Sequence, residues 1–349
     1  MKTLLKLAPP VTLLLTIFLF SCKVSQTSME VLKPADINVP QHIKKVAVAN
    51  RSLPAKGDKL ANILEGLISG EQIFADREGS NHCINGLVEN LNSAPRFVAV
   101  MASSNTLFGT GTREFAPALS WASVDSICKA YGVDAVILLE TFDSNTNIRE
   151  SSKDVKKSRD GKEYYEKVFM AELCIDVNSG WRIYDNIQKR IIDQNDYLDG
   201  KCFRGEGPNI SAAKNKLPVK RQAINQTGYF SGQQYGLRIS PNWITVQRTY
   251  FVKGHDGFKE ARKHVKFNNW DAAEQIWMNL SKDPDPVVAG RALHNMALAA
   301  EMKGDLDKAI QFASRASKEY HIKESRTYIA VLERRKADEY RLDEQMKTD

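Results

Sequence analysis

The chain has 349 residues, of which 42% are hydrophobic and 26% charged, and its formal net charge is +7. These values are typical of a globular protein, and the length predicts two domains at roughly 100–200 residues each. Basic residues are spread along the chain, apart from runs at 153–157 and 214–221. Neither run carries the stacking aromatic residues of a nucleic-acid interface, so we expect no nucleic-acid partner. We interpret both runs as solvated loops, with attraction to an anionic membrane surface as the alternative.

The first segment of the chain has the layout of a secretory signal peptide. Lys2 and Lys6 precede an apolar stretch at 11–20. This stretch is shorter than the about 20 residues that a membrane-spanning helix needs. A basic start, a short apolar run and a small residue at the exit are the features of a cleaved signal.

A cysteine stands directly after that small residue, since Ser21 is followed by Cys22. Residues 18–22 resemble a bacterial lipobox, in which the signal is cut before the cysteine and the thiol carries lipid. We therefore expect a lipoprotein signal peptide at 1–21 and lipidation of Cys22. An ordinary signal peptide followed by a chance cysteine is the alternative interpretation.

Cleavage at this point would place the mature chain outside the cytoplasm, tied to a membrane. Residues 22–40 are polar and show no periodicity, so we expect a flexible lipidated tether there. No acidic run follows Cys22. Some Bacteroidota-type lipoproteins carry such a run as a surface-export signal, so its absence favours an outer-membrane protein that faces the periplasm.

The mature chain contains four further cysteines, Cys83, Cys128, Cys174 and Cys202. An exported protein can form disulfides, but the spacing of these cysteines indicates no disulfide framework. We expect free thiols, or at most one pair. No cluster of cysteine and histidine has the spacing of metal ligands, so the sequence predicts no metal site.

Residues 41–253 predict a mixed parallel and antiparallel sheet domain with flanking helices. Short apolar runs predict strands at 43–50, 96–100 and 133–140. Helices are expected between them at 60–67, 83–91 and 124–131, the last capped by Ser123 and ended by Gly132. This alternation predicts right-handed crossovers and a partly parallel sheet.

The second half of this domain predicts antiparallel strands and one long helix. Apolar residues alternate over 169–177, and a turn at 178–180 is expected to lead into a partner strand at 181–197. A helix is expected at 219–239, followed by a strand at 243–251. The helix carries a stripe of three glycines, Gly228, Gly232 and Gly236. Each glycine costs the helix about 1 kcal/mol, so we expect compensating close packing against the sheet, with an interaction groove as the alternative.

Residues 254–349 predict two helical hairpins and a charged capping helix at 323–346. The pattern at 268–273 recurs at 304–309. It resembles a tetratricopeptide repeat, in which small residues occupy the points where helices touch. We expect the repeat-packing residues to lie in these contacts; they are Ala273, Trp277, Ala297 and Ala309.

The whole arrangement resembles an uncharacterised family of Bacteroidota-type envelope lipoproteins. The features that carry the resemblance are the lipobox, the sheet domain, the glycine-striped helix before Pro241-Asn242-Trp243, and the terminal repeats. The sheet domain is similar in outline to the N-terminal domains of the Tol-system periplasmic protein and of curli-secretion lipoproteins. The resemblance implies an envelope location and a binding role, and it supplies no catalytic residues.

Two functions are open at this point. The favoured one is a non-enzymatic adaptor or assembly factor that binds an envelope protein on the concave face of its repeats. The repeats would otherwise simply pack on the sheet domain. The alternative is a small-ligand binder or enzyme that uses residues at the strand ends, Arg51, Glu140 and Asp143. No cofactor is predicted, and the sequence does not set the oligomeric state.

Overall fold

The computed structural model describes residues 24–54, 70–103, 106–111 and 113–346. The predicted signal peptide, Cys22 and the helix expected at 60–67 lie outside the described residues. Within them, no helix combines the length and the apolar character that crossing a membrane requires.

The chain forms two compact units, and neither is continuous in sequence. What we call the helical unit contains Thr245–Lys336 and the described residues up to Met29. The sheet unit contains Glu30–Ile244 and the described residues from Ala337 onward. The boundary expected at 253/254 therefore falls earlier, between Ile244 and Thr245, because the next residues pack against the helices.

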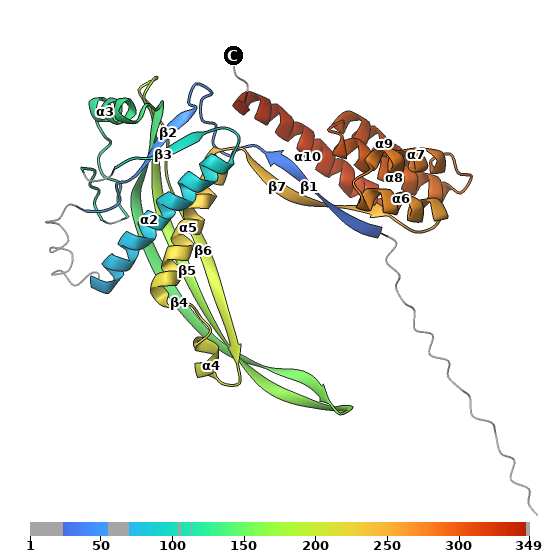
Figure 1. Ribbon diagram of the computed structural model, residues 1–349, viewed down its shortest axis with the longest axis horizontal. Coiled ribbons are helices and arrows are strands. Elements are labelled where there is room, and N and C mark those ends of the chain that lie inside the picture. Colours follow the sequence, from blue (N-terminus) through green and yellow to red (C-terminus); the bar gives the residue numbers. More distant parts are fainter. Residues whose placement is uncertain (1–23, 55–69, 104–105, 112, 347–349) are drawn as a thin grey trace, which may run out of the picture. The chain divides into compact units, whose positions relative to one another are not determined.

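A five-stranded sheet with the order β3-β2-β4-β5-β6 forms the sheet unit (Figure 1). β2 (Lys45–Asn50) is parallel to both β3 (Val98–Met101) and β4 (Ala135–Arg159). β5 (Lys162–Asp185) and β6 (Arg190–Gly207) extend the sheet with antiparallel pairing. Together with the helices that follow, this confirms the predicted fold class, a mixed sheet domain followed by an all-helical region.

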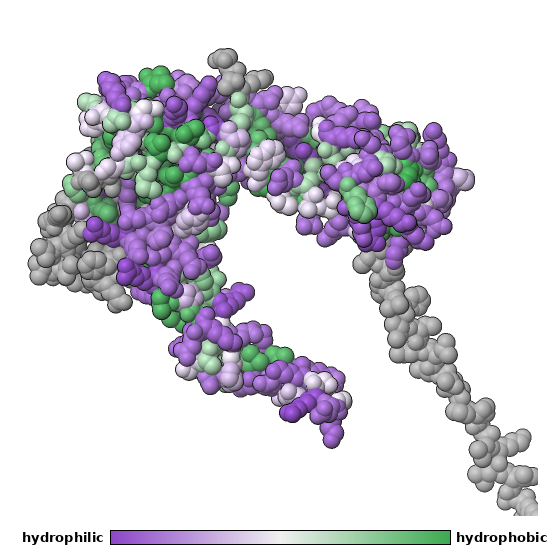
Figure 2. Space-filling model, in the orientation of Figure 1, coloured by the Kyte–Doolittle hydropathy of each residue, from purple (hydrophilic) through white to green (hydrophobic). Residues whose placement is uncertain are grey.

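The turn predicted at 178–180 is wrong. β4 and β5 pair up to a turn at Asp160-Gly161, and β5 continues through 178–180 to a turn at 186–189. Gly180 lies within the strand opposite Thr141, and glycine is needed there because a Cβ atom would come within 2.3 Å of the Thr141 hydroxyl oxygen. Beyond the end of β6, β4 and β5 continue as a two-stranded hairpin whose visible surface is largely hydrophilic (Figure 2).

Helices pack on both faces of the sheet. α2 (Gly70–Ser93) and α5 (Lys220–Ile239) cover one face, and α3 (Trp121–Tyr131) packs on the other. Alternate residues of β2 face opposite sides of the sheet. Val46 and Val48 are buried in the core on one side, and Ala47 and Ala49 in the core on the other. A short helix, α4 (Ile210–Lys214), follows β6.

α3 begins one turn earlier than predicted. Its N-cap is Ser120, whose hydroxyl oxygen accepts a hydrogen bond from the Ser123 N–H at 3.2 Å. The predicted cap at Ser123 is therefore wrong, although Gly132 ends the helix as expected, with φ of 63°.

The glycine stripe of α5 packs against α2, not against the sheet. A Cβ atom on Gly228 would lie 2.4 Å from the Gly79 carbonyl oxygen, and one on Gly232 would lie 1.8 Å from the Cys83 carbonyl oxygen. The prediction of close packing at the glycine stripe was thus correct, but the partner is α2 and not the sheet. Two helix backbones touch here, which only glycine permits.

The expected tether is largely a strand. β1 (Val24–Lys33) pairs with β7 (Asn242–Phe251) in a separate two-stranded sheet. Met29 and Val31, two residues apart, are both buried. The flexible tether predicted over 22–40 is therefore wrong for the ten residues of β1, because β7 supplies the backbone partner that the sequence does not reveal.

The all-helical region consists of five helices in succession. They are α6 (Asp256–Lys266), α7 (Trp270–Leu280), α8 (Pro286–Met302), α9 (Leu306–Lys318) and α10 (Lys323–Met346). α7 contacts both α6 and α8, and α8 contacts α9. Four of the helices begin at a side-chain cap that accepts a hydrogen bond from the first turn: His255, Asn269, Asp285 and Asp305.

Candidate functional site

The strand ends bring Arg51 and Glu140 together but not Asp143. Arg51 Nη1 lies 3.1 Å from Glu140 Oε2. They meet because the parallel pairing of β2 with β4 ends at Asn50 and Leu139, which directly precede Arg51 and Glu140. Asp143 pairs instead with Arg113 at the surface.

The Arg51–Glu140 pair belongs to a closed cluster. Arg182 of β5 places Nη1 2.9 Å from Glu140 Oε1, and the Tyr184 hydroxyl lies 3.3 Å from the same oxygen. Arg51 and Arg182 also donate to the carbonyl oxygens of Pro117 and Ala116. Burial raises the pKa of Glu140, while the two guanidinium groups oppose that rise. Glu140 is 0% exposed and both its oxygens are engaged, so the cluster ties the sheet to the segment that precedes α3.

In the helical unit, side chains of α8 hold the backbone of strand β7. Asn295 Nδ2 donates to the Phe251 carbonyl oxygen, and its Oδ1 accepts from the Phe251 N–H, both at 2.8 Å. His294 Nε2 lies 3.2 Å from the Thr249 carbonyl oxygen. Residues 249 and 251 share one edge of the strand. The side chains of α8 therefore bind the main-chain groups of an extended strand.

The protonation of His294 follows from its partners. Because a carbonyl oxygen can only accept, Nε2 must carry the proton, and Nδ1 then accepts from the Ser325 hydroxyl at 2.9 Å. Burial lowers the pKa of His294. The ring is thus held neutral against the strand.

A buried carboxylate fixes the other end of the same strand segment. Glu301 of α8 is fully buried, and Arg248 and Arg335 each approach its Oε1, at 2.8 and 2.9 Å. The Tyr328 hydroxyl donates to Glu301 as well. Burial opposes ionisation, but hydrogen bonds from Arg248 and Tyr328 prevail and lower the pKa of Glu301. This network joins β7, α8 and α10.

A cleft of about 230 Å³, which we call the β7–α10 cleft, opens beside these contacts. Its lining residues come from β7, α8 and α10: Gln247, Arg248, Thr249, His294, Glu324, Thr327, Tyr328 and Val331. Val331 is 41% exposed. The cleft thus combines polar side chains with one exposed apolar side chain, Val331.

The predicted repeat-packing residues all lie in the core of the helical unit. Ala273, Trp277, Ala297 and Ala309 are 0% exposed. The Trp277 ring lies 6.3 Å from the Tyr250 ring of β7, which explains why a large residue stands at this position. Asn295 and His294 were missed by sequence reasoning, although two polar residues within an apolar helix are a signal that could have found them.

The cysteines agree with the expectation of at most one pair. Cys174 and Cys202, directly opposite in β5 and β6, form a disulfide, and Cys83 and Cys128 are free and buried. Burial raises the pKa of Cys128 to about 11. Glu172 lies close to the disulfide sulfurs, but sulfurs joined in a disulfide do not act as thiolate ligands for a metal.

The comparisons with known proteins give a family without a function. The family described as Domain of unknown function (DUF8603) matches residues 43–251, more than half of the chain, so the chain belongs to this family. A second family, Domain of unknown function (DUF6340), matches residues 259–341. No curated protein matches the chain.

Two solved structures show distant similarity. A homologue of a neuraminyllactose-binding hemagglutinin from Helicobacter pylori is 12% identical, covers 57% of this chain and 83% of its own, and has a TM-score of 0.21. The PelC dodecamer from Paraburkholderia phytofirmans is 7% identical, covers 60% and 99%, and has a TM-score of 0.18. Neither similarity is close enough to carry an argument.

Proposed function

We propose that this protein is a lipid-anchored, non-enzymatic envelope protein that acts as an adaptor or assembly factor through its helical unit. The observation that supports the proposal is the pair of hydrogen bonds from the Asn295 side chain to the backbone of Phe251. Main-chain contacts of this kind accept an extended segment of almost any sequence, while pockets beside them select side chains.

The β7–α10 cleft is the proposed place for a partner segment. Thr327 and Glu324 supply hydrogen-bonding groups on α10, and Val331 supplies an apolar contact. The concave face expected to bind a partner is in part filled by β7, so the partner would lie beside this strand.

The proposed partner is an envelope protein that faces the periplasm, and Cys22 is the proposed lipid site. The resemblance to Bacteroidota-type envelope lipoproteins supports this location. We propose neither a nucleic-acid partner nor a cofactor. The alternative of a ligand site at Arg51, Glu140 and Asp143 gains no support, because both oxygens of Glu140 are engaged within the cluster and Asp143 pairs elsewhere.

Site-specific photocrosslinking in intact cells tests the proposal. A photoreactive amino acid at Val331 or Thr327 should give a discrete crosslink to one envelope protein. The same amino acid at Ala330, which is exposed on the same helix but does not line the cleft, should not. Val331→Arg should abolish the Thr327 crosslink without lowering the melting temperature. Equal crosslinking at all three positions, or none from a folded protein, would contradict the proposed site.

A further inference from the structure

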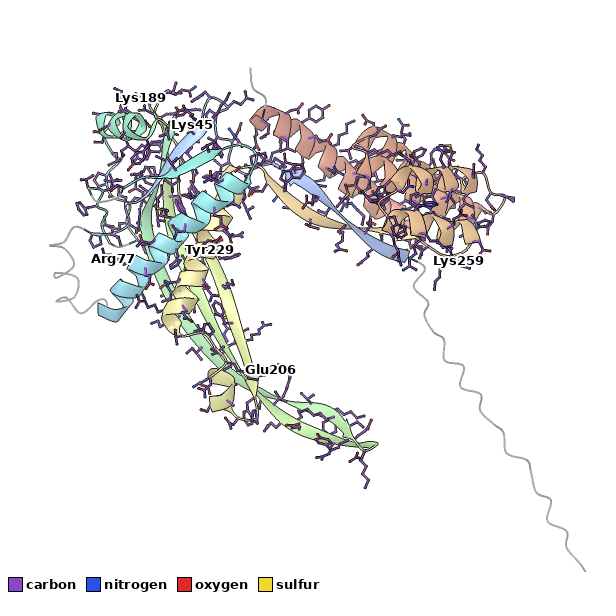
Figure 3. The ribbon with its side chains drawn as sticks, in the orientation of Figure 1. Lys45, Arg77, Lys189, Glu206, Tyr229 and Lys259 are labelled. Atoms are coloured by element: carbon purple, nitrogen blue, oxygen red, sulfur yellow. A yellow bond between two sulfur atoms is a disulfide. The ribbon has the colours of Figure 1, made fainter. Side chains whose placement is uncertain are left out.

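Four cations follow one face of α6. Lys259, Arg262, Lys263 and Lys266 are all exposed, and their spacing of three and four residues places them in a single row, which we call the basic stripe. The opposite face carries residues that are buried in the helical core, Phe258, Ala261 and Val265. The side chain of Lys259 lies on the outside of the unit (Figure 3).

Most of the charge on the basic stripe is not neutralised. Lys259 pairs with Asp256 at 2.8 Å. No acidic side chain in the described part of the chain forms an ion pair with Arg262, Lys263 or Lys266, and Glu260 is exposed beside them. The stripe therefore presents a surplus of positive charge to the solvent.

An aromatic side chain adjoins the stripe. Phe267 directly follows α6 and is 86% exposed, more than any other large hydrophobic side chain in the described residues. Cations beside a bare aromatic ring suit the boundary of a lipid bilayer, where phosphate groups meet the acyl chains. An acidic protein surface would match the cations but would leave Phe267 without an apolar environment.

The start of β1 belongs to the same unit as α6. Val24 packs against the hydrophobic core to which α6 contributes Phe258 and Ala261. Val24 stands two residues after Cys22, so at most about 7 Å of chain separates this unit from the proposed lipid site. A lipid attached there would hold the helical unit at the membrane surface.

We propose that the basic stripe and Phe267 bind the anionic surface of the membrane that holds the anchor. The argument from the short distance between Val24 and Cys22 rests on the proposed lipid anchor. The arguments from the charge of the basic stripe and the exposure of Phe267 do not. A basic patch is a second membrane signal that strengthens the hold of a covalent lipid. Each cation close to an anionic surface strengthens binding by roughly fivefold.

Vesicle binding by the full mature chain with Cys22→Ala tests the stripe without any contribution from a lipid. The probe is a vesicle of phosphatidylglycerol and phosphatidylcholine in equal amounts, compared with phosphatidylcholine alone. We expect binding to the anionic vesicles that weakens with added salt. Lys263→Glu with Lys266→Glu should weaken it by at least about tenfold. Lys323→Glu with Arg326→Glu makes the same change in net charge on exposed residues of α10, and should alter it by less than about threefold.

Three results would overturn the proposal. One is equal binding to both kinds of vesicle. Another is an equal loss in the stripe variant and in its matched control. The third is tighter binding of polyglutamate than of vesicles, lost in the stripe variant, which would assign the stripe to an acidic protein. Fatty-acid labelling of Cys22 in the parent chain is a separate readout, so failure of the anchor and failure of the stripe are distinguishable.

Discussion

Asp76 lies on α2 in surroundings that disfavour its charge. Its side chain is partly buried and accepts a hydrogen bond from the Ser144 hydroxyl. Burial raises the pKa of Asp76 from 3.8 to about 6. The folded protein therefore binds this proton more tightly than the unfolded chain does, and the free energy of unfolding falls as pH rises from about 4 to about 6.

Asp76→Asn keeps the acceptor oxygen and removes the charge. We expect it to stabilise the sheet unit at pH 7 by on the order of 2 kcal/mol and to flatten the dependence between about pH 4 and 6. Urea unfolding at several pH values measures both effects. Asp154→Asn, at an exposed position of the same unit, serves as the control and should change neither. A less stable Asp76→Asn protein at pH 7 would contradict the burial argument.

Trp277 and Ala309 test the packing of the helical unit. Trp277→Ala removes a fully buried ring and should cost about 3–5 kcal/mol. Ala309→Leu overpacks a filled contact and should cost roughly 1–3 kcal/mol. Thermal unfolding measures both, with Ala330→Leu at an exposed alanine as the matched control. If both buried variants melt like the parent, the assignment of these residues to the helix contacts is wrong.

At the scale of elements, the crossing of α2 and α5 depends on backbone contact. A methyl group at Gly232 would meet the Cys83 carbonyl oxygen, and carbonyl oxygens within a helix have little freedom to move. We expect Gly232→Ala to destabilise the sheet unit by about 1–3 kcal/mol or more, despite the gain in helix propensity. Gln226→Ala, exposed on the same helix, should be nearly neutral or stabilising. The free energies of unfolding of the two variants, measured in denaturant, distinguish the cost of lost backbone packing from the gain in helix propensity.

The elements that the sequence predicts well are those with a strong hydrophobic pattern of their own. β2 and the start of β4 are short apolar runs, and the sheet buries both their faces. The errors come from contacts with distant partners. Gly180 looks like a turn residue, but it is a strand residue opposite Thr141. β1 is polar, and only its pairing with β7 makes it a strand.

The candidate site was predictable only where it follows from the order of strands with a clear hydrophobic pattern. Arg51 and Glu140 meet because Arg51 follows β2 and Glu140 follows the stretch of β4 that pairs in parallel with β2. Asp143 does not join them, because β4 continues far beyond Glu140 and the chain does not leave the sheet there. The contacts of Asn295 with Phe251 join residues 44 positions apart, and no local pattern specifies them.

At the scale of the whole molecule, the proposed lipidation of Cys22 determines where the protein acts. Cys22→Ala should abolish lipid attachment and leave the chain either uncut or released from the membrane. Metabolic labelling with a fatty-acid analogue measures attachment, and Cys128→Ala, which removes a buried free thiol, is the control that should keep the label. Label that persists on Cys22→Ala would contradict the anchor.

The strand β1 also has a mechanical consequence. A flexible tether ending at residue 40 would span roughly 25 Å and would stretch before it carried any load. With β1 in place, only the link between Cys22 and Val24 is left to extend, and it reaches at most about 7 Å. A pull on a bound partner would then pass to the lipid through the hydrogen bonds between β1 and β7. A lipid at Cys22 would therefore make a stiff coupling with almost no slack, and a force on the partner would reach the membrane directly.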